Sequence, residues 1–124
     1  MFDFLAWIYL INSVLLIVHE IDSAYWKEWN LFRLPGDIAG FLIIHLPLLF
    51  VVQLGLALMF LNVWAGLIFS LILALSGLFA FSAHMFFIAR GKDEFKTSAS
   101  IAILSATLLV SLIQLPVTLF LLAG

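Results

Sequence analysis

The chain has 124 residues, of which 66% are hydrophobic and only 10% are charged, and its mean hydropathy is +1.30. Soluble domains are nearer half apolar and a quarter charged, which excludes a soluble fold for this chain. Five Lys and Arg residues with a net charge of −2 form no phosphate-binding face, so nucleic acid is excluded as a partner. The absence of Cys excludes disulfides and thiolate metal sites. The composition predicts an integral membrane protein whose environment is the lipid bilayer.

Four apolar stretches are long enough to cross a bilayer, because a hydrocarbon core of ~30 Å needs roughly 20 helical residues. They cover residues 2–19, 38–61, 63–89 and 97–122. Strands are excluded because these runs are long and do not alternate in polarity. The pattern predicts an all-α fold, with a single transmembrane domain over residues 1–124 that forms an antiparallel, up-down-up-down four-helix bundle.

The basic residues predict the orientation. All five lie in two connections, residues 20–37 and 90–96. By the positive-inside rule these loops are cytoplasmic and both termini are extracytoplasmic, in the plasma (inner) membrane. Aromatic residues within residues 25–32 recur at helical spacing. This spacing predicts a short cytoplasmic interfacial helix, or an extension of the first span.

Polar residues inside the spans predict a buried seam, since lipid does not drive apolar faces together and membrane interfaces use small and polar side chains. A single Ser or Thr commonly bonds only the carbonyl four residues earlier in its own helix. Asn and Gln are costlier to bury and favour bonds between helices. The predicted seam consists of Asn12, Gln53, Thr107, Ser111 and Gln114.

The three histidines, His19, His45 and His84, lie in three different spans. At ~1.5 Å per residue, each is about 9–12 Å from the predicted cytoplasmic end of its helix. Ionisable residues at such a depth normally face the bundle interior and mark function. Asp22 follows His19 by three residues, so both side chains can point at one centre. Three imidazoles and a carboxylate suit a divalent metal: Zn²⁺, or Fe or Mn with an open coordination position.

Glu20 points about 100° away from His19 around the helix. It is the candidate catalytic acid or base, or a partner that fixes a histidine tautomer. The three histidines have two interpretations. They either form a shared metal or proton-transfer centre, or they are unrelated residues at the membrane interface. The second interpretation is open because a lone histidine at a helix end often makes only an interfacial hydrogen bond.

The segment His19-Glu20-Ile21-Asp22-Ser23, followed by Trp26 and Trp29, resembles the HXXEE-type small prokaryotic membrane proteins. These proteins carry His-x-x-Glu-Glu near the end of their first span. His19 matches the histidine and Asp22 conservatively matches the first acid, whereas Ser23 departs from the second. The resemblance implies a compact four-span membrane protein with a polar centre, in a family of uncharacterised function.

Three functions fit these features. The first is a membrane-embedded, metal-dependent enzyme whose lipid or other hydrophobic substrate arrives laterally from the bilayer. The second is a proton or metal-ion transporter or channel that uses the polar seam. Because one chain has only four spans, this function favours a pore formed by a homo-oligomer. The third is a non-catalytic membrane subunit or lipid-binding module.

Overall fold

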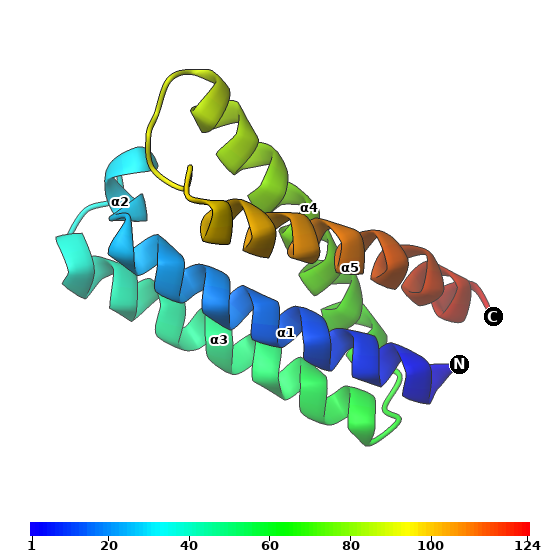
Figure 1. The fold of residues 1–124 in the computed structure, drawn as a ribbon. Helices are drawn as coiled ribbons and strands as arrows, with labels where there is room; N and C mark the ends of the chain where they lie inside the picture. The colour runs from blue at the N-terminus through cyan, green and yellow to red at the C-terminus, as the bar shows by residue number, and fades with distance from the viewer.

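The computed structural model describes residues 1–124 and contains helices only. Consecutive long helices run in opposite directions, and both termini lie at the same end of the bundle (Figure 1). The predicted all-α, four-helix bundle is confirmed. Its elements in chain order are α1 (Phe2–Tyr25), α2 (Glu28–Leu31), α3 (Asp37–Phe60), α4 (Ala65–Ala89) and α5 (Ser98–Ala123).

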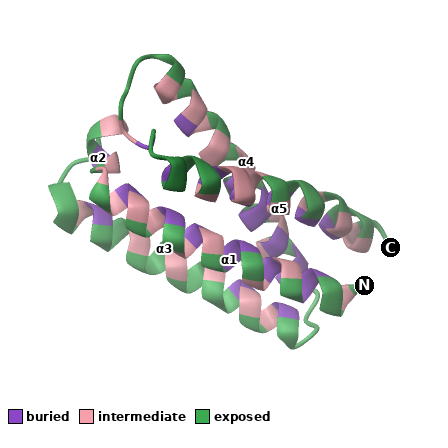
Figure 2. Cartoon of the chain, viewed as in Figure 1, coloured by how far each residue is buried: buried purple, intermediate pink, exposed green.

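The four long helices are apolar enough and long enough to cross a membrane, with 24 to 26 residues each. At ~1.5 Å per residue they extend about 36–39 Å, which exceeds the ~30 Å of a hydrocarbon core. The outer faces are exposed and apolar, most of all on α3, where only Phe41, Gly55 and Met59 are buried (Figure 2). An apolar surface of this kind is favourable in contact with lipid and unfavourable in contact with water.

The first helix is longer than the predicted span and reaches Tyr25. Lys27 then adopts a left-handed backbone conformation, with φ = 54°, which ends the helical path and reverses the chain. The single turn of α2 follows directly at Glu28. Both predicted forms of this segment are therefore present, because α1 is extended and a separate short helix comes after it.

A hydrogen-bonded polar network joins α1, α4 and α5 in the middle of the bundle. The Asn12 side-chain amide donates to Ser111 Oγ at 3.0 Å and to Gln114 Oε1 at 2.7 Å. The Gln114 amide in turn donates to the carbonyl and the hydroxyl of Ser70, at 3.1 and 2.9 Å. The Ser70 and Thr118 hydroxyls lie 2.8 Å apart. All five residues are buried, so the network is an internal tie between the three helices.

Two predicted members of the seam behave differently. Thr107 is buried, but its hydroxyl donates to the Ile103 carbonyl of its own helix at 2.9 Å. Gln53 lies on the exposed face of α3 and does not join the network. The neighbouring residue marks the inward side of that helix, since the Val52 carbonyl accepts a 2.8 Å hydrogen bond from the Tyr9 hydroxyl. One residue of helix rotates the side chain by about 100°, which is enough to move Gln53 to the outside.

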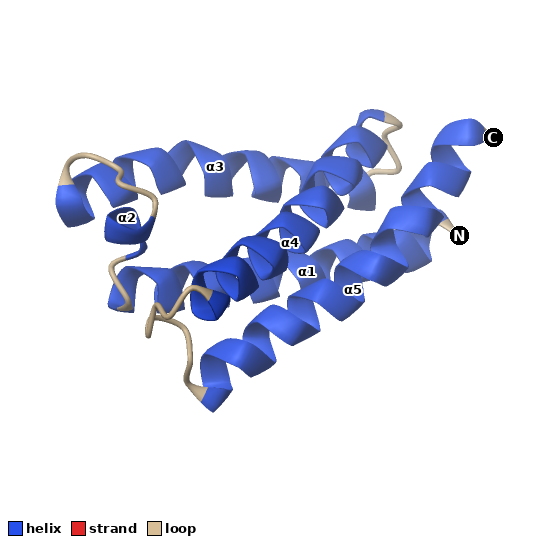
Figure 3. Ribbon diagram, turned by 90° about the horizontal axis from the view of Figure 1, so that it is seen from above, coloured by secondary structure: helices blue, strands red, loops and turns tan.

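Two glycines determine where α4 packs closely on its neighbours. Gly66 lies against Met59 of α3, so that a Cβ there would be 2.9 Å from the Met59 sulfur. A Cβ at Gly77 would clash with the Ser111 hydroxyl of α5. Small residues allow such close approach of helix backbones. Beyond Gly66, towards α2, α3 and α4 separate (Figure 3). A cavity of about 880 Å³ lies between α1, α3 and α4.

Candidate metal centre

Histidines and glutamates from four helices line one cavity near the α2 end of the bundle. The set contains all three histidines of the chain. Most of the remaining lining is apolar, since 15 of the 22 lining residues are hydrophobic. The polar side chains of the cavity include His19, Glu20, Glu28, His45 and His84.

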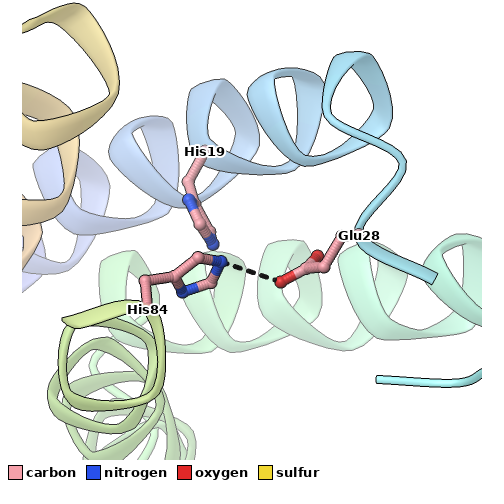
Figure 4. Close-up of side chains that lie close together, drawn as sticks. All are labelled: His19, Glu28 and His84. Carbon is pink, nitrogen blue, oxygen red and sulfur yellow. Dashed lines mark ion pairs between the residues drawn. The ribbon is translucent and has the colours of Figure 1, made fainter. Parts of the chain in front are cut away.

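The first donor group is formed by His19, Glu28 and His84, which point toward one another from α1, α2 and α4 (Figure 4). His84 Nε2 lies 3.1 Å from Glu28 Oε1, and the His84 side chain is only 2% exposed. The His19 and His84 rings meet edge to face with their centroids 4.8 Å apart. One donor atom from each of the three residues lies within 4.8 Å of the other two.

The second donor group is formed by Glu20, Glu28 and His45, and its donor atoms also lie within 4.8 Å of one another. His45 Nε2 of α3 is 2.7 Å from Glu20 Oε2 of α1. Both side chains are 14% exposed. Glu28 belongs to both groups, so the two groups adjoin at its carboxylate.

Backbone carbonyls set the tautomers of two histidines. His45 Nδ1 lies 2.7 Å from the Phe41 carbonyl, and His84 Nδ1 lies 2.7 Å from the Ala80 carbonyl. Because a carbonyl only accepts, both Nδ1 atoms must donate, which leaves a lone pair on each Nε2 of a neutral ring. Each Nε2 then faces a carboxylate oxygen, which is also an acceptor. A cation must bridge such a pair, either a proton or a metal ion.

Unpartnered polar atoms gather at the same place. His19 Nδ1, His84 Nε2 and Glu20 Oε2 are buried and have no hydrogen-bond partner. Leaving buried acceptors unsatisfied costs about 1–3 kcal/mol each. A proton can serve only one acceptor pair, whereas a metal ion binds three or more donors. Metal-bound histidines also usually donate their other ring N–H to a carbonyl or a carboxylate, as His45 and His84 do.

Aromatic side chains close the centre at the α2 end. Phe95, from the connection between α4 and α5, is fully buried. Its ring packs edge to face on the His84 ring, with the two centroids 4.2 Å apart. Its backbone has φ = 65°, a left-handed conformation that costs a residue other than Gly on the order of 1–3 kcal/mol. Phe32 also lies edge to face with His84, and their ring centroids are 6.3 Å apart. These rings separate the donors from the loops outside.

Glu28 is the carboxylate that organises the centre. Burial raises the pKa of Glu28, but the neighbouring His84 and His19 side chains, in their protonated form, lower it by more, and the net shift is downward. Its side chain is 12% exposed. Glu28 is therefore an ionised carboxylate held among imidazoles, which is the state a metal ligand requires.

The predicted site residues occupy the following places. The three histidines and Glu20 lie at the two donor groups. Asp22 lies in neither group, and its Oδ2 atom is buried without a hydrogen-bond partner. Ser23, one residue further on, contacts the His19 ring instead, with 3.5 Å between Ser23 Oγ and His19 Nε2. A residue four positions along a helix is only about 40° from its starting direction, whereas a residue three positions along is about 60° away.

Sequence reasoning did not assign Glu28 to the site. Its side chain reaches the histidines because the chain reverses at Lys27 and folds α2 back against α1 and α3. One signal was available, since Glu28 is the only carboxylate within the aromatic segment of residues 25–32. A charged residue among membrane-interface aromatics needs a partner, and the candidates were the basic residues Lys27 and Arg33 and the histidines.

The sequence matches a family of unknown function, DUF6713, over residues 5–121. The chain belongs to this family. The match agrees with the expectation of a small protein from an uncharacterised family, and it does not confirm the HXXEE-type resemblance. No curated protein and no solved structure matches the chain.

Proposed function

We propose that this DUF6713 protein is a membrane-embedded, metal-dependent enzyme that acts on a lipid or another hydrophobic substrate. The observation that carries the proposal is the position of the unpartnered His and Glu donors on the wall of an otherwise apolar cavity. A divalent ion bound there would polarise a carbonyl or phosphoryl group, or supply a hydroxide at neutral pH. Zn²⁺ fits this donor set, and so do Fe²⁺ and Mn²⁺.

The dimensions of the donor groups support metal binding. Donor atoms about 2.0–2.2 Å from one tetrahedral ion lie about 3.3–3.6 Å apart. The atoms of each group lie within 4.8 Å of one another, so each group would have to close by up to about 1.5 Å when an ion binds. Each group takes its donors from α1 and α2 and from either α3 or α4, so an ion bound in either group would connect three helices.

The cavity supports a hydrophobic substrate. Its volume of about 880 Å³ lies within the range of small-molecule sites. Ile44 and Leu48 of α3 and Leu75 and Phe79 of α4 line it, and these four side chains are also exposed on the outer surface. An apolar molecule could therefore enter between α3 and α4 directly from the bilayer. Its polar group would then meet the His and Glu side chains at the far end.

The proposed orientation places the centre near the cytoplasmic leaflet. Every basic residue of the chain lies at the α2 end, in the connections after α1 and after α4. The positive-inside rule assigns that end to the cytoplasm and both termini to the opposite side. The basic residues are Lys27, Arg33, Arg90, Lys92 and Lys96.

An ion-transport function has less support. A transport path through the seam would need polar atoms that are free to bind a moving ion or water. The Asn12 amide nitrogen instead donates to Ser111 and Gln114 in the buried centre of the bundle, and only Asn12 Oδ1 lacks a hydrogen-bond partner there. Gln53, which would extend the path, lies on the outer face.

The enzymatic proposal is tested with purified protein loaded with Zn²⁺, Mn²⁺ or Fe²⁺ and incubated with the lipid extract of its expression host. We expect mass spectrometry to show at least one lipid species consumed and a product formed, because the cavity brings a lipid to the bound ion. Chelator treatment and His84→Ala should each abolish the conversion, whereas Ser82→Ala should leave it unchanged. Ser82 is the matched control, since it is exposed on the same helix and bonds only its own Leu78 carbonyl.

Two results would refute the proposal. Less than a tenth of an equivalent of metal after loading would remove the metal centre. An unchanged lipid pool despite bound metal would remove the enzymatic activity and favour a non-catalytic, lipid-binding module.

A further inference from the structure

We infer that the centre holds two divalent ions that share the carboxylate of Glu28. The inference rests on the proposed metal centre and specifies its composition. Two sets of three donors have their donor atoms within 4.8 Å of one another, and Glu28 is the only residue common to both. A carboxylate has two oxygens, so one side chain can serve one ion on each side.

The directions in which two consecutive donors leave α1 fit two ions better than one. His19 and Glu20 are consecutive, so their side chains leave the helix about 100° apart. His19 faces His84 of α4, with the two ring centroids 4.8 Å apart. Glu20 faces His45 of α3, with Glu20 Oε2 2.7 Å from His45 Nε2. One ion would therefore lie between α1 and α4, and the other between α1 and α3.

The donor count supports the same arrangement. Each ion would have two residues of its own and Glu28 as the third, which leaves open positions for water and substrate, as in catalytic sites. Two-metal sites hold their ions about 3.5–4 Å apart, a separation that one bridging carboxylate spans. Two divalent ions bring four positive charges, whereas the two donor groups contain only two carboxylates, Glu20 and Glu28. The remaining positive charge favours a substrate with an anionic group, such as a phosphate or a carboxylate.

Metal stoichiometry tests the inference with the full-length protein in detergent. We expect two equivalents of Zn²⁺ per chain by elemental analysis after gel filtration. Loading with Mn²⁺ should give the electron paramagnetic resonance spectrum of an exchange-coupled pair. In Glu28→Gln the coupling should disappear and the metal content should fall to one equivalent or less, whereas the exposed Asp93→Asn should keep two coupled ions. Gln has the shape of Glu but lacks the second anionic oxygen.

Variants of the unshared donors give an independent measurement if Glu28→Gln does not fold. His45→Ala should remove one ion and leave the other, so the content should fall from two equivalents to one and the coupled signal should vanish. One equivalent in the wild-type protein would overturn the two-ion centre while the proposed metal centre stands. Two uncoupled ions would overturn the shared carboxylate. Absence of bound metal would overturn both proposals.

Discussion

Replacing His84 by alanine is expected to weaken Zn²⁺ binding at the donor group of His19, Glu28 and His84 by at least about 100-fold. His84 is only 2% exposed, and its Nε2 atom faces Glu28 at 3.1 Å without a hydrogen-bond partner. Losing an outer-shell partner of a metal ligand already costs about 10–100-fold in affinity, so losing a ligand costs more. A competition titration against a chromogenic Zn²⁺ chelator measures the change.

The comparison variant on the same helix is Ser82→Ala, for which we expect an affinity within twofold of wild type. A wild-type affinity in His84→Ala would show that the ion binds elsewhere. If the alanine variant does not fold, His19→Ala gives the same comparison, because His19 belongs to the same donor group on a different helix.

Replacing Gln114 by alanine is expected to lower the free energy of unfolding by about 2–4 kcal/mol. Gln114 is fully buried, accepts from Asn12, and donates to Ser70. Hydrogen bonds between membrane helices contribute about 0.6–1.7 kcal/mol each, and each buried partner left unsatisfied adds to the loss. Denaturation of the detergent-solubilised protein, followed by tryptophan fluorescence, measures the difference.

Gln53→Ala makes the same chemical change on the exposed face of α3, and we expect it to change the free energy of unfolding by less than about 0.5 kcal/mol. Equal losses in the two variants would contradict the assignment of Gln114 to an internal tie between helices. The comparison also tests the transport function, because a side chain that is hydrogen-bonded to two neighbouring helices is not free to bind a moving ion.

Most of the fold could be predicted from the sequence because the apolar runs are long and occur four times. Four uninterrupted apolar runs leave helices as the only structure that satisfies the backbone in lipid. Short connections then require antiparallel neighbours. In the fourth span the predicted seam residues Thr107, Ser111 and Gln114 recur every three or four positions, which determines the inward direction well, and all three are buried.

Helix rotation was less predictable where the pattern is weak. The span that became α3 carries only a few polar residues on an otherwise apolar surface, so its inward face could not be located to within one residue. Gln53 lies outside for this reason, and His45 reaches the site from the inward face on which Phe41 lies. The packing of Tyr9 on Val52 determines that rotation, and it depends on contacts between distant residues.

The histidines were identifiable as a group, but their principal carboxylate was not. Depth along a helix follows from counting residues, which placed His19, His45 and His84 at one level. The position of Glu28 depends on a left-handed residue, Lys27, that is neither Gly nor Asn. Local preference argues against that conformation, and tertiary packing of the aromatic segment overrides it.

The most direct test of a shared metal centre is an anomalous-scattering map from crystals of the Zn²⁺-loaded protein, measured at the zinc absorption edge. We expect the strongest peak inside the bundle beside the Glu28 carboxylate, about 2.0–2.2 Å from the Nε2 atom of His84. A map whose peaks all lie on the surface, with the three imidazoles turned toward lipid or solvent, would contradict the metal centre.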